Sequence, residues 1–187
     1  MSVSDYEQWE ERYQRLGRSR RLPDSLLREN WPILSGPKVL DVACGEGRNA
    51  LFLAARGFQA IGLDRSPTAV ARAQKWAADA DLDCRFICWD LETLSLPDTG
   101  FDSIVVTRYW QPALCPILTA ALKPGGVLLY ETYTVDYLRY RPQSRREFLL
   151  QSGELERCFA GLQVLRSAEV DKPETREYCA QLIARKV

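Results

Sequence analysis

Residues 39–50 constrain the fold of this chain more than any other segment. An apolar run leads into Asp41-Val-Ala, and the chain then passes through Cys44-Gly-Glu-Gly47 into a helical pattern. Glycine permits a tight turn and lets the backbone lie close to a ligand. The order of strand, glycine turn and helix predicts a βα unit with a binding site at the carboxyl end of its strand.

The rest of the chain repeats this alternation of short apolar runs and helical patterns, which predicts an α/β fold with a parallel sheet between helices. Five runs are expected as parallel strands. Two later runs, separated by the turn-rich sequence Asp171-Lys-Pro-Glu174, are expected to form a closing antiparallel hairpin. The expected strands are residues 38–43, 59–63, 84–89, 101–107, 126–132, 162–169 and 177–185.

Helix signals lie between these runs. One helix is expected at residues 48–56 and ends at Gly57, and another begins with Ser66 as its N-cap and Pro67 at its first position. Residues 5–16 place Trp9 and Tyr13 at helical spacing on one face. The length of 187 residues is sufficient for one hydrophobic core and too short for a second full domain.

Composition excludes several classes of protein. The sequence contains 25 basic and 25 acidic residues, and this zero formal charge does not favour a broadly basic nucleic-acid-binding protein. It contains no histidine, which excludes histidine-dependent triads, histidine-ligated metals and a histidine general base. A polar start and the lack of any run near the ~20 apolar residues of a membrane span predict no secretory signal and no membrane anchor. Six scattered cysteines predict reduced core thiols, no metal site and a cytoplasmic location.

Acidic residues at strand ends indicate a nucleoside-containing ligand. Asp64 ends the second apolar run, 19 residues after Gly45 (64 − 45), where a carboxylate can accept both hydroxyl protons of a ribose. A carboxylate at Glu46 would repel the pyrophosphate of a dinucleotide. Each acidic residue alone has a simpler reading, because Asp41 or Asp64 could cap a helix and Asp90 could close an Asx turn.

At this point the sequence resembles the class I S-adenosylmethionine-dependent methyltransferases, whose first motif is an acidic residue before a Gly-x-Gly-x-Gly-like loop. The match is Asp41-Val-Ala-Cys-Gly-Glu-Gly47, and it continues in order through Asp64, Trp89-Asp90-Leu91 and Leu122-Lys-Pro-Gly-Gly-Val127. The sequence of the loop and of the following helix is similar to those of tellurite-resistance-type and related small-molecule methyltransferases. Ala43 replaces a glycine of many members, and we expect an ordinary negative φ there.

The resemblance implies a Rossmann-like, seven-stranded, mostly parallel sheet with an antiparallel final strand. It also implies S-adenosylmethionine as cofactor and S-adenosylhomocysteine as product. The glycine loop would wrap the methionine, Asp64 would hold the ribose, Asp90 and the backbone of Leu91 would hold the adenine, and no metal is implied. The implied cofactor-binding residues are Trp9, Tyr13, Asp41, Ala43, Cys44, Gly45, Gly47, Asn49, Asp64, Arg65, Ser66, Asp90, Leu91 and Thr107, and the implied catalytic residues are Arg108, Tyr109 and Tyr133.

Methyl transfer suits a protein without histidine, because a sulfonium donor is already activated and positioning supplies most of the acceleration. A soft or anionic acceptor needs no base, whereas an oxygen or amine acceptor needs one, and the candidates are Tyr109, Tyr133, Glu131 and Asp136. Aromatic side chains could enclose the positive methyl group or could simply pack in the core; these are Trp9, Tyr13, Tyr109 and Trp110. Residues 133–146 hold four arginines that could bind an anion or form a solvated face.

We therefore expect methyl transfer to a small acceptor that is soft or anionic, such as a sulfur, selenium or tellurium compound or a carboxylate. Two alternatives stay open: an RNA or protein methyltransferase, and a non-catalytic cofactor-binding regulatory or partner subunit. A nucleic-acid partner is less favoured than a small molecule, and monomer or homodimer is undecided. Within one domain of residues 1–187, we expect a helical lid at 1–37, a cofactor-binding core at 38–132, an acceptor-side insert and helix at 133–160 and a closing hairpin at 161–187.

Overall fold

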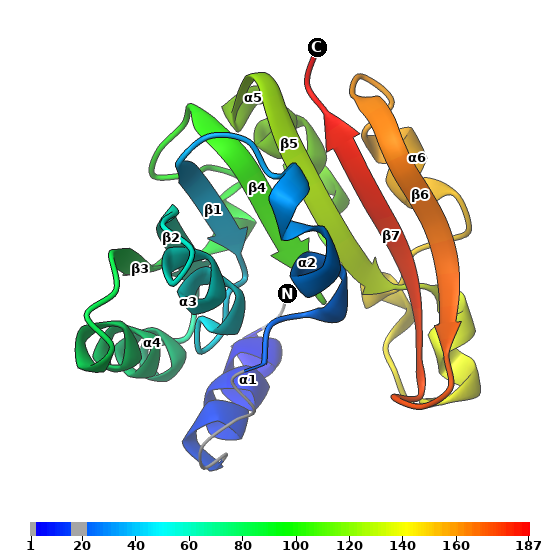
Figure 1. Ribbon diagram of the computed structural model, residues 1–187. Helices are drawn as coiled ribbons and strands as arrows, with labels where there is room; N and C mark the ends of the chain where they lie inside the picture. Colours follow the sequence, from blue (N-terminus) through cyan, green and yellow to red (C-terminus); the bar gives the residue numbers. More distant parts are fainter. Residues whose placement is uncertain (1–2, 16–21) are drawn as a thin grey trace.

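A computed structural model describes residues 3–15 and 22–187, without the side chains of residues 3–6 and 8. Residues 1–2 and 16–21 of the expected lid lie outside the described residues. In the described residues, seven strands form one sheet in the order β3-β2-β1-β4-β5-β7-β6 (Figure 1), and β7 alone runs opposite to the other six, which confirms the predicted α/β sheet. The strands are β1 Lys38–Val42, β2 Gln59–Asp64, β3 Cys84–Cys88, β4 Phe101–Thr107, β5 Leu122–Tyr133, β6 Gln163–Lys172 and β7 Glu177–Arg185.

Helices cover both faces of the sheet. Alternate positions of β4 show this, because Val105 packs with α2, α3 and α4, whereas Ile104 and Val106 pack with α5 and α6. The first helix, α1, lies at the carboxyl edge of the sheet, toward which β1 and β4 point (Figure 1). The α-helices are α1 Val3–Arg15, α2 Ser25–Asn30, α3 Arg48–Ala54, α4 Pro67–Asp79, α5 Cys115–Ala121 and α6 Glu154–Cys158, and short 3-10 turns span Trp31–Ile33, Leu91–Thr93, Pro112–Leu114, Val135–Arg139 and Arg146–Phe148.

Several boundaries differ from those expected. β5 starts at Leu122, before its Pro-Gly-Gly sequence, because Leu122 pairs with Phe101 of β4, and Gly125 and Gly126 then exchange backbone hydrogen bonds with Lys186. β6 continues to Lys172, three residues beyond the expected end at residue 169, because Lys172 still pairs with Glu177 of β7. Pairing across the sheet therefore extends strands through residues that locally favour a turn.

All six cysteines are free thiols, and Cys88 is exposed rather than in the core as expected. Among the described residues, no helix is long and apolar enough to span a membrane.

Asp41 joins β1 to α3. Its Oδ2 accepts a hydrogen bond from the backbone N–H of Ala50 at 3.1 Å, in the first turn of the helix, while its Oδ1 is buried without a partner in the described structure. The simpler reading, a helix-capping carboxyl, is therefore what its contacts show. Burial raises the pKa of Asp41 to about 7, because the charged carboxylate loses its hydration there.

The raised pKa of Asp41 predicts a pH-dependent stability. A carboxyl that holds its proton more tightly when folded stabilises the fold below its unfolded pKa, and this contribution is lost as pH rises toward 7. Asp41→Asn keeps an acceptor for Ala50 and removes the titration. We expect its free energy of unfolding to exceed that of the wild type by more at pH 8 than at pH 5. Because the pKa of Asp41 rises by roughly three units on folding, titration of this group can change the difference between the two proteins by at most about 4 kcal/mol. Urea unfolding at both pH values measures this, and equal differences would contradict it.

Candidate functional site

A pocket lies at the carboxyl ends of β1 to β4, beneath α1. It encloses about 570 Å³ of space between atoms, including the part that is open to solvent. Its lining residues are Trp9, Tyr13, Ala43, Asp64, Arg65, Asp90, Leu91, Glu92, Arg108 and Tyr109. All of them except Glu92 are residues that the sequence predicted for the site.

The carboxylate of Asp64 holds two turns of the chain together. Its Oδ2 accepts a hydrogen bond from the backbone N–H of Gly45 at 2.8 Å, and its Oδ1 accepts one from the N–H of Ser66 at 2.9 Å. Asp64 is nearly buried, and burial raises its pKa although both backbone hydrogen bonds act in the opposite direction. Because these bonds lie behind the pocket wall, Asp64 sets the relative positions of the glycine loop and the start of α4.

Ala43 departs from the expected backbone conformation. Its φ is +54°, followed by φ values of +55° at Gly45 and +77° at Gly47, so the expected negative φ was wrong. The left-handed conformation costs a non-glycine residue about 1–2 kcal/mol. The turn imposes it because the chain leaves β1 and reverses direction within a few residues. Glycine would therefore suit this position better than alanine does.

Other predicted site residues lie behind or beside the pocket. Cys44 packs in the core, and the side chain of Ser66 caps α4 by accepting from the N–H of Ala69. Asn49 links two elements, since its Oδ1 accepts from the N–H of Asp24 and its Nδ2 donates to Thr107. The residues that do not line the pocket are Asp41, Cys44, Gly45, Gly47, Asn49, Ser66, Thr107 and Tyr133.

The expected repulsion between Glu46 and a pyrophosphate was wrong, because Glu46 does not face the pocket. Its carboxylate is buried and forms an ion pair with Arg72 at 2.8 Å, and it does not line the pocket. Its charge is therefore neutralised by Arg72 instead of facing a ligand.

At the β3 end of the pocket, the carboxylate of Asp90 contacts the described residues Glu92 and Arg65. Its Oδ1 accepts from the N–H of Glu92 at 3.0 Å, which forms the Asx-type cap considered above, and its Oδ2 lies 3.8 Å from Arg65. The carboxylate remains about half exposed at the pocket. Its capping role and its place in the wall are therefore compatible.

The structure places the four candidate bases in different surroundings. Burial, together with the charges of Glu92 and Asp90, raises the pKa of Tyr109, so its side chain stays a neutral phenol. Tyr133 lies outside the pocket, where it donates to Glu177 and stacks on Tyr137 with ring centroids 4.1 Å apart. The two carboxylates among the candidates are paired, Glu131 with Lys172 and Asp136 with Arg139. Trp110 is buried against Tyr130 in the core.

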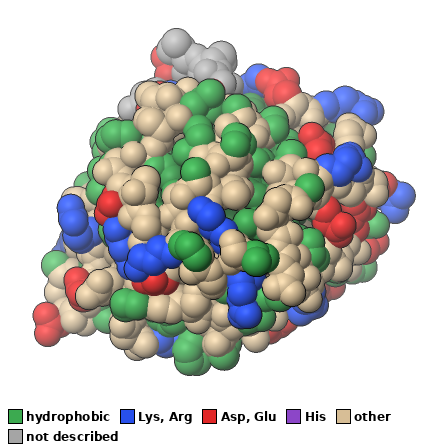
Figure 2. Space-filling model, turned by 90° about the horizontal axis from the view of Figure 1, so that it is seen from above, with side chains coloured by type: hydrophobic (Ala, Val, Ile, Leu, Met, Phe, Trp, Pro, Cys, Tyr) green, Lys and Arg blue, Asp and Glu red, His purple; other side chains and the backbone are tan. Residues whose placement is uncertain are grey.

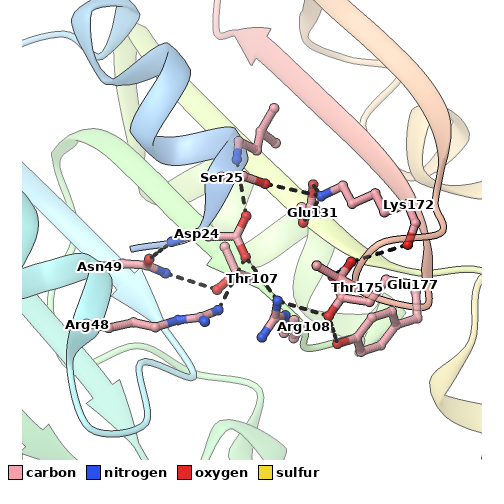
Figure 3. A network of polar contacts seen from close by, with 12 residues as sticks. Asp24, Ser25, Arg48, Asn49, Thr107, Arg108, Glu131, Lys172, Thr175 and Glu177 are labelled. Atoms are coloured by element: carbon pink, nitrogen blue, oxygen red, sulfur yellow. Dashed lines mark hydrogen bonds and ion pairs between the residues drawn. The ribbon is translucent and has the colours of Figure 1, made fainter. Parts of the chain in front are cut away.

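Arg108 joins the pocket to a polar network at the ends of β4, β5 and β7 (Figure 3). Its φ is +58°, and its backbone N–H donates to the carbonyl of Glu131 at 2.8 Å. One terminal nitrogen of its guanidinium lies 3.0 Å from Glu177 and 3.8 Å from Asp24. Glu177 in turn accepts from Tyr133 and Thr175, so the β6–β7 turn reaches the edge of the pocket.

Sequence reasoning missed Asp24, Lys172 and Glu177. Asp24 had a detectable signal, because it precedes Ser25-Leu-Leu and caps α2. Lys172 and Glu177 had none. Only the pairing of β7 between β5 and β6 brings these two residues to the carboxyl edge.

Glu131 and Lys172 form a buried ion pair in this network. Lys172 Nζ lies 2.8 and 2.9 Å from the two carboxylate oxygens, and Gln181 Nε2 donates to one of them at 2.5 Å. Glu131 is fully buried, and burial raises its pKa despite these donors. The pair therefore neutralises a charge that the interior would otherwise disfavour.

Removing Lys172 leaves Glu131 buried without its counter-charge, so we expect Lys172→Met to lower the free energy of unfolding by about 3 kcal/mol. Lys123→Met is the matched control, because Lys123 pairs with Asp102 at the surface and its loss is expected to cost less than about 1 kcal/mol. Urea unfolding measures both. Equal losses for the two variants would contradict the assignment of a buried pair.

The pocket fits a cofactor that carries cationic groups and a ribose. Its wall holds one more carboxylate than guanidinium, and three aromatic rings. Carboxylates accept from hydroxyl and ammonium groups, and ring faces attract cations. The carboxylates are Asp64, Asp90 and Glu92, the guanidinium groups are Arg65 and Arg108, and the rings are Trp9, Tyr13 and Tyr109. Within the described chain, no group of three or more acidic or cysteine side chains could hold a metal ion.

Comparison with known proteins agrees with this geometry. Residues 39–126 match a family model described as a methyltransferase domain. Hemagglutinin 1 of Eikenella corrodens is 30% identical over 154 residues, which cover 78% of this chain and 50% of that protein. The chain spans about half the length of the curated relatives that it matches.

Two solved structures share the fold. TehB from Haemophilus influenzae superimposes with a TM-score of 0.74 and 21% identity, over 86% of this chain and 61% of that chain. Magnesium protoporphyrin IX methyltransferase from Synechocystis, solved with S-adenosylhomocysteine, superimposes with a TM-score of 0.71 and 15% identity. The match covers 99% of this chain and 95% of that chain. The family model spans the glycine loop and the strands whose ends form the pocket, so residues 39–126 of this chain are similar to a methyltransferase domain.

Proposed function

We propose that this chain transfers the methyl group of S-adenosylmethionine to a small acceptor that is anionic or a soft nucleophile. The observation that carries the proposal is the guanidinium of Arg108 at the pocket wall. Among the described residues only one of its terminal nitrogens has partners, Glu177 and Asp24. The other N–H groups are available to an anion that enters the pocket.

The chemistry of the wall supports an acceptor that needs no deprotonation by the protein. When bound, S-adenosylmethionine supplies a methyl group that its sulfonium has already activated. Tyr109 keeps its proton because its pKa is raised, and Asp64 already accepts two backbone hydrogen bonds. Thiolates, selenium or tellurium oxyanions and carboxylates are nucleophilic without a base, so these classes suit the pocket best.

Five of the wall residues have a proposed role toward the cofactor. Asp64 would accept from the ribose hydroxyls and Asp90 from the adenine amino group. Leu91 stands at the first position of its 3-10 turn, where a backbone N–H is not used by the turn and could reach the ring. Trp9 and Tyr13 of α1 would cover the ligand and exclude water.

The contacts of the insert favour a small acceptor over RNA. Arg139 pairs with Asp136, and Arg145 pairs with Glu147, so two arginines of this segment are neutralised by neighbouring carboxylates. On the face drawn in Figure 2, which is the end opposite α1 and the carboxyl edge of the sheet, basic side chains are spread in small groups among acidic and hydrophobic ones. A phosphate backbone is bound by continuous positive surface, so that opposite face does not offer an RNA site either.

Removing the carboxylate at the end of β2 tests the ribose assignment. We expect Asp64→Ala to weaken binding of S-adenosylhomocysteine by about tenfold or more, because charge-assisted hydrogen bonds are lost. Asp79→Ala, at the exposed end of α4, is the control and should bind like the wild type. Calorimetry measures both affinities, and thermal unfolding checks that the variants are folded. Unchanged affinity in folded Asp64→Ala would rule out this role.

Arg108→Met tests the anionic acceptor. With S-adenosylmethionine and a panel of tellurite, selenite, thiols and small carboxylic acids, we expect the wild type to methylate at least one. The variant should raise the KM for that acceptor about tenfold or more, and Arg108→Lys should restore part of the loss. Affinity for S-adenosylhomocysteine should stay unchanged.

Two other outcomes would contradict the proposal in different ways. If Arg108→Met weakens S-adenosylhomocysteine but leaves methylthioadenosine unaffected, Arg108 binds the carboxylate of the cofactor instead of the acceptor. If the wild type binds cofactor and methylates nothing in the panel, the reading as a cofactor-binding partner subunit gains support.

A further inference from the structure

In the described part of helix α1, the contacts that hold it over the pocket are mainly polar. None of its described side chains is buried: Glu10 and Tyr13 are half-buried, and the others are exposed, including Trp9 at 41%. A helix that packs few apolar groups into the core has a low cost of detachment. Its position over the pocket therefore depends on specific hydrogen bonds and ion pairs.

The first of these contacts is made by Glu10. Its carboxylate accepts hydrogen bonds from the hydroxyl groups of Ser66 and Thr68, in the first turn of α4. The amino end of a helix favours a negative charge. Although partial burial opposes it, these hydroxyl bonds lower the pKa of Glu10, so the carboxylate is charged at neutral pH.

The second contact is made by Arg72 of α4. One guanidinium nitrogen donates to the backbone carbonyl of Tyr13 at 2.6 Å and to the carboxylate of Glu46 at 2.8 Å. Tyr13 lies in the last turn of α1, where backbone carbonyls lack partners within the helix and a positive charge is favourable. Arg72 therefore joins the end of α1 directly to the glycine loop.

The side chain of Tyr13 rests on the same loop. A Cβ built on Gly45 would lie 2.6 Å from the Tyr13 hydroxyl oxygen, closer than real contacts allow. The absence of a side chain at Gly45 is what lets α1 approach the loop so closely. Tyr13 and Trp9 also line the pocket, so α1 lies in the path between the pocket and solvent.

We infer that α1 is a gate over the cofactor pocket, held closed by two latches, Glu10 on the amino end of α4 and Arg72 between Tyr13 and the glycine loop. The identity of the ligand that passes the gate rests on the proposed function, whereas the latches belong to the protein without ligand. Both latches converge on α4. Opening requires that they break together, while the core of the sheet stays intact. Glu10 and Arg72 are positioning residues that act through α1.

Hydrogen–deuterium exchange of the full chain without ligand tests the latches. We expect amides of α1 to exchange about tenfold faster in Glu10→Ala than in the wild type, because the closed state loses its contact with α4. Glu11→Ala is the matched control on the same helix, since Glu11 is exposed and, among the described residues, its ion pair is with Arg15. Exchange in the sheet should be equal in all three proteins.

A partner variant shows whether Glu10 acts through α4. Thr68→Val removes one hydroxyl donor and keeps the shape of the side chain. Combined with Glu10→Ala, it should add little to the acceleration seen in Glu10→Ala alone, because contacting residues have non-additive effects. Equal exchange of α1 in Glu10→Ala and Glu11→Ala, or full additivity with Thr68→Val, would overturn the Glu10 latch.

The Arg72 latch needs a variant that leaves no buried charge unpaired. The double variant Arg72→Met/Glu46→Gln removes the bridge together with the carboxylate that it neutralises, and Lys75→Met is its control, because Lys75 pairs with Asp79 on the exposed side of α4. We expect faster exchange of α1 in the double variant alone. Exchange at the control rate would overturn this latch.

Ligand kinetics complete the test. In stopped-flow measurements with S-adenosylhomocysteine, we expect the dissociation rate to rise about tenfold in Glu10→Ala and to stay at the wild-type value in Glu11→Ala. An unchanged dissociation rate in Glu10→Ala would overturn the gate as a barrier to the ligand. Failure of the wild type to bind S-adenosylhomocysteine would instead contradict the proposed function, and the exchange comparison would still decide on the latches.

Discussion

The two backbone hydrogen bonds to the Asp64 carboxylate hold the candidate site together. One comes from the glycine loop after β1, and the other comes from the start of α4 after β2. Together with the hydrogen bond from the N–H of Cys44 to the carbonyl of Leu63 at 2.9 Å, this side chain sets the spacing of the two loops. The pocket wall and the seat of α1 on the first turn of α4 follow this spacing, while buried apolar residues hold the rest of α4 on the sheet. A nearly buried carboxylate is suited to this task because two charge-assisted bonds satisfy it.

A second polar centre lies on the other side of the pocket, where β4, β5 and β7 end. Here the β6–β7 turn contributes Glu177, which holds the Arg108 guanidinium at the pocket edge. The buried pair of Glu131 and Lys172 supports the same region from behind. Charged groups in this network are matched, so Arg108 can present its remaining N–H groups without an unpaired charge in the interior. The orientation of Arg108 is therefore set by the last hairpin of the chain.

The site is covered by an element of a different kind. The central strands β1, β4, β5 and β7 are buried in the sheet, whereas the described residues of α1 attach through Glu10, Arg72 and the contact between Tyr13 and Gly45. Local stability follows the number of buried apolar contacts, so α1 is the part of the site that can move while the rest stays folded. A rigid wall with a weakly attached cover suits a ligand that must enter, react and leave.

The sequence alone determined the βα rhythm, the glycine loop, the acidic ends of β1 and β2 and most of the pocket wall, because these features are local and each follows directly from a strand end. It was wrong about the φ of Ala43, since the turn imposes a conformation that alanine does not prefer. It could not place Lys172 and Glu177 beside Arg108, nor turn Glu46 toward Arg72. Those contacts join residues far apart in the chain, and only the order of strands in the sheet and the packing of α4 decide which distant charges meet.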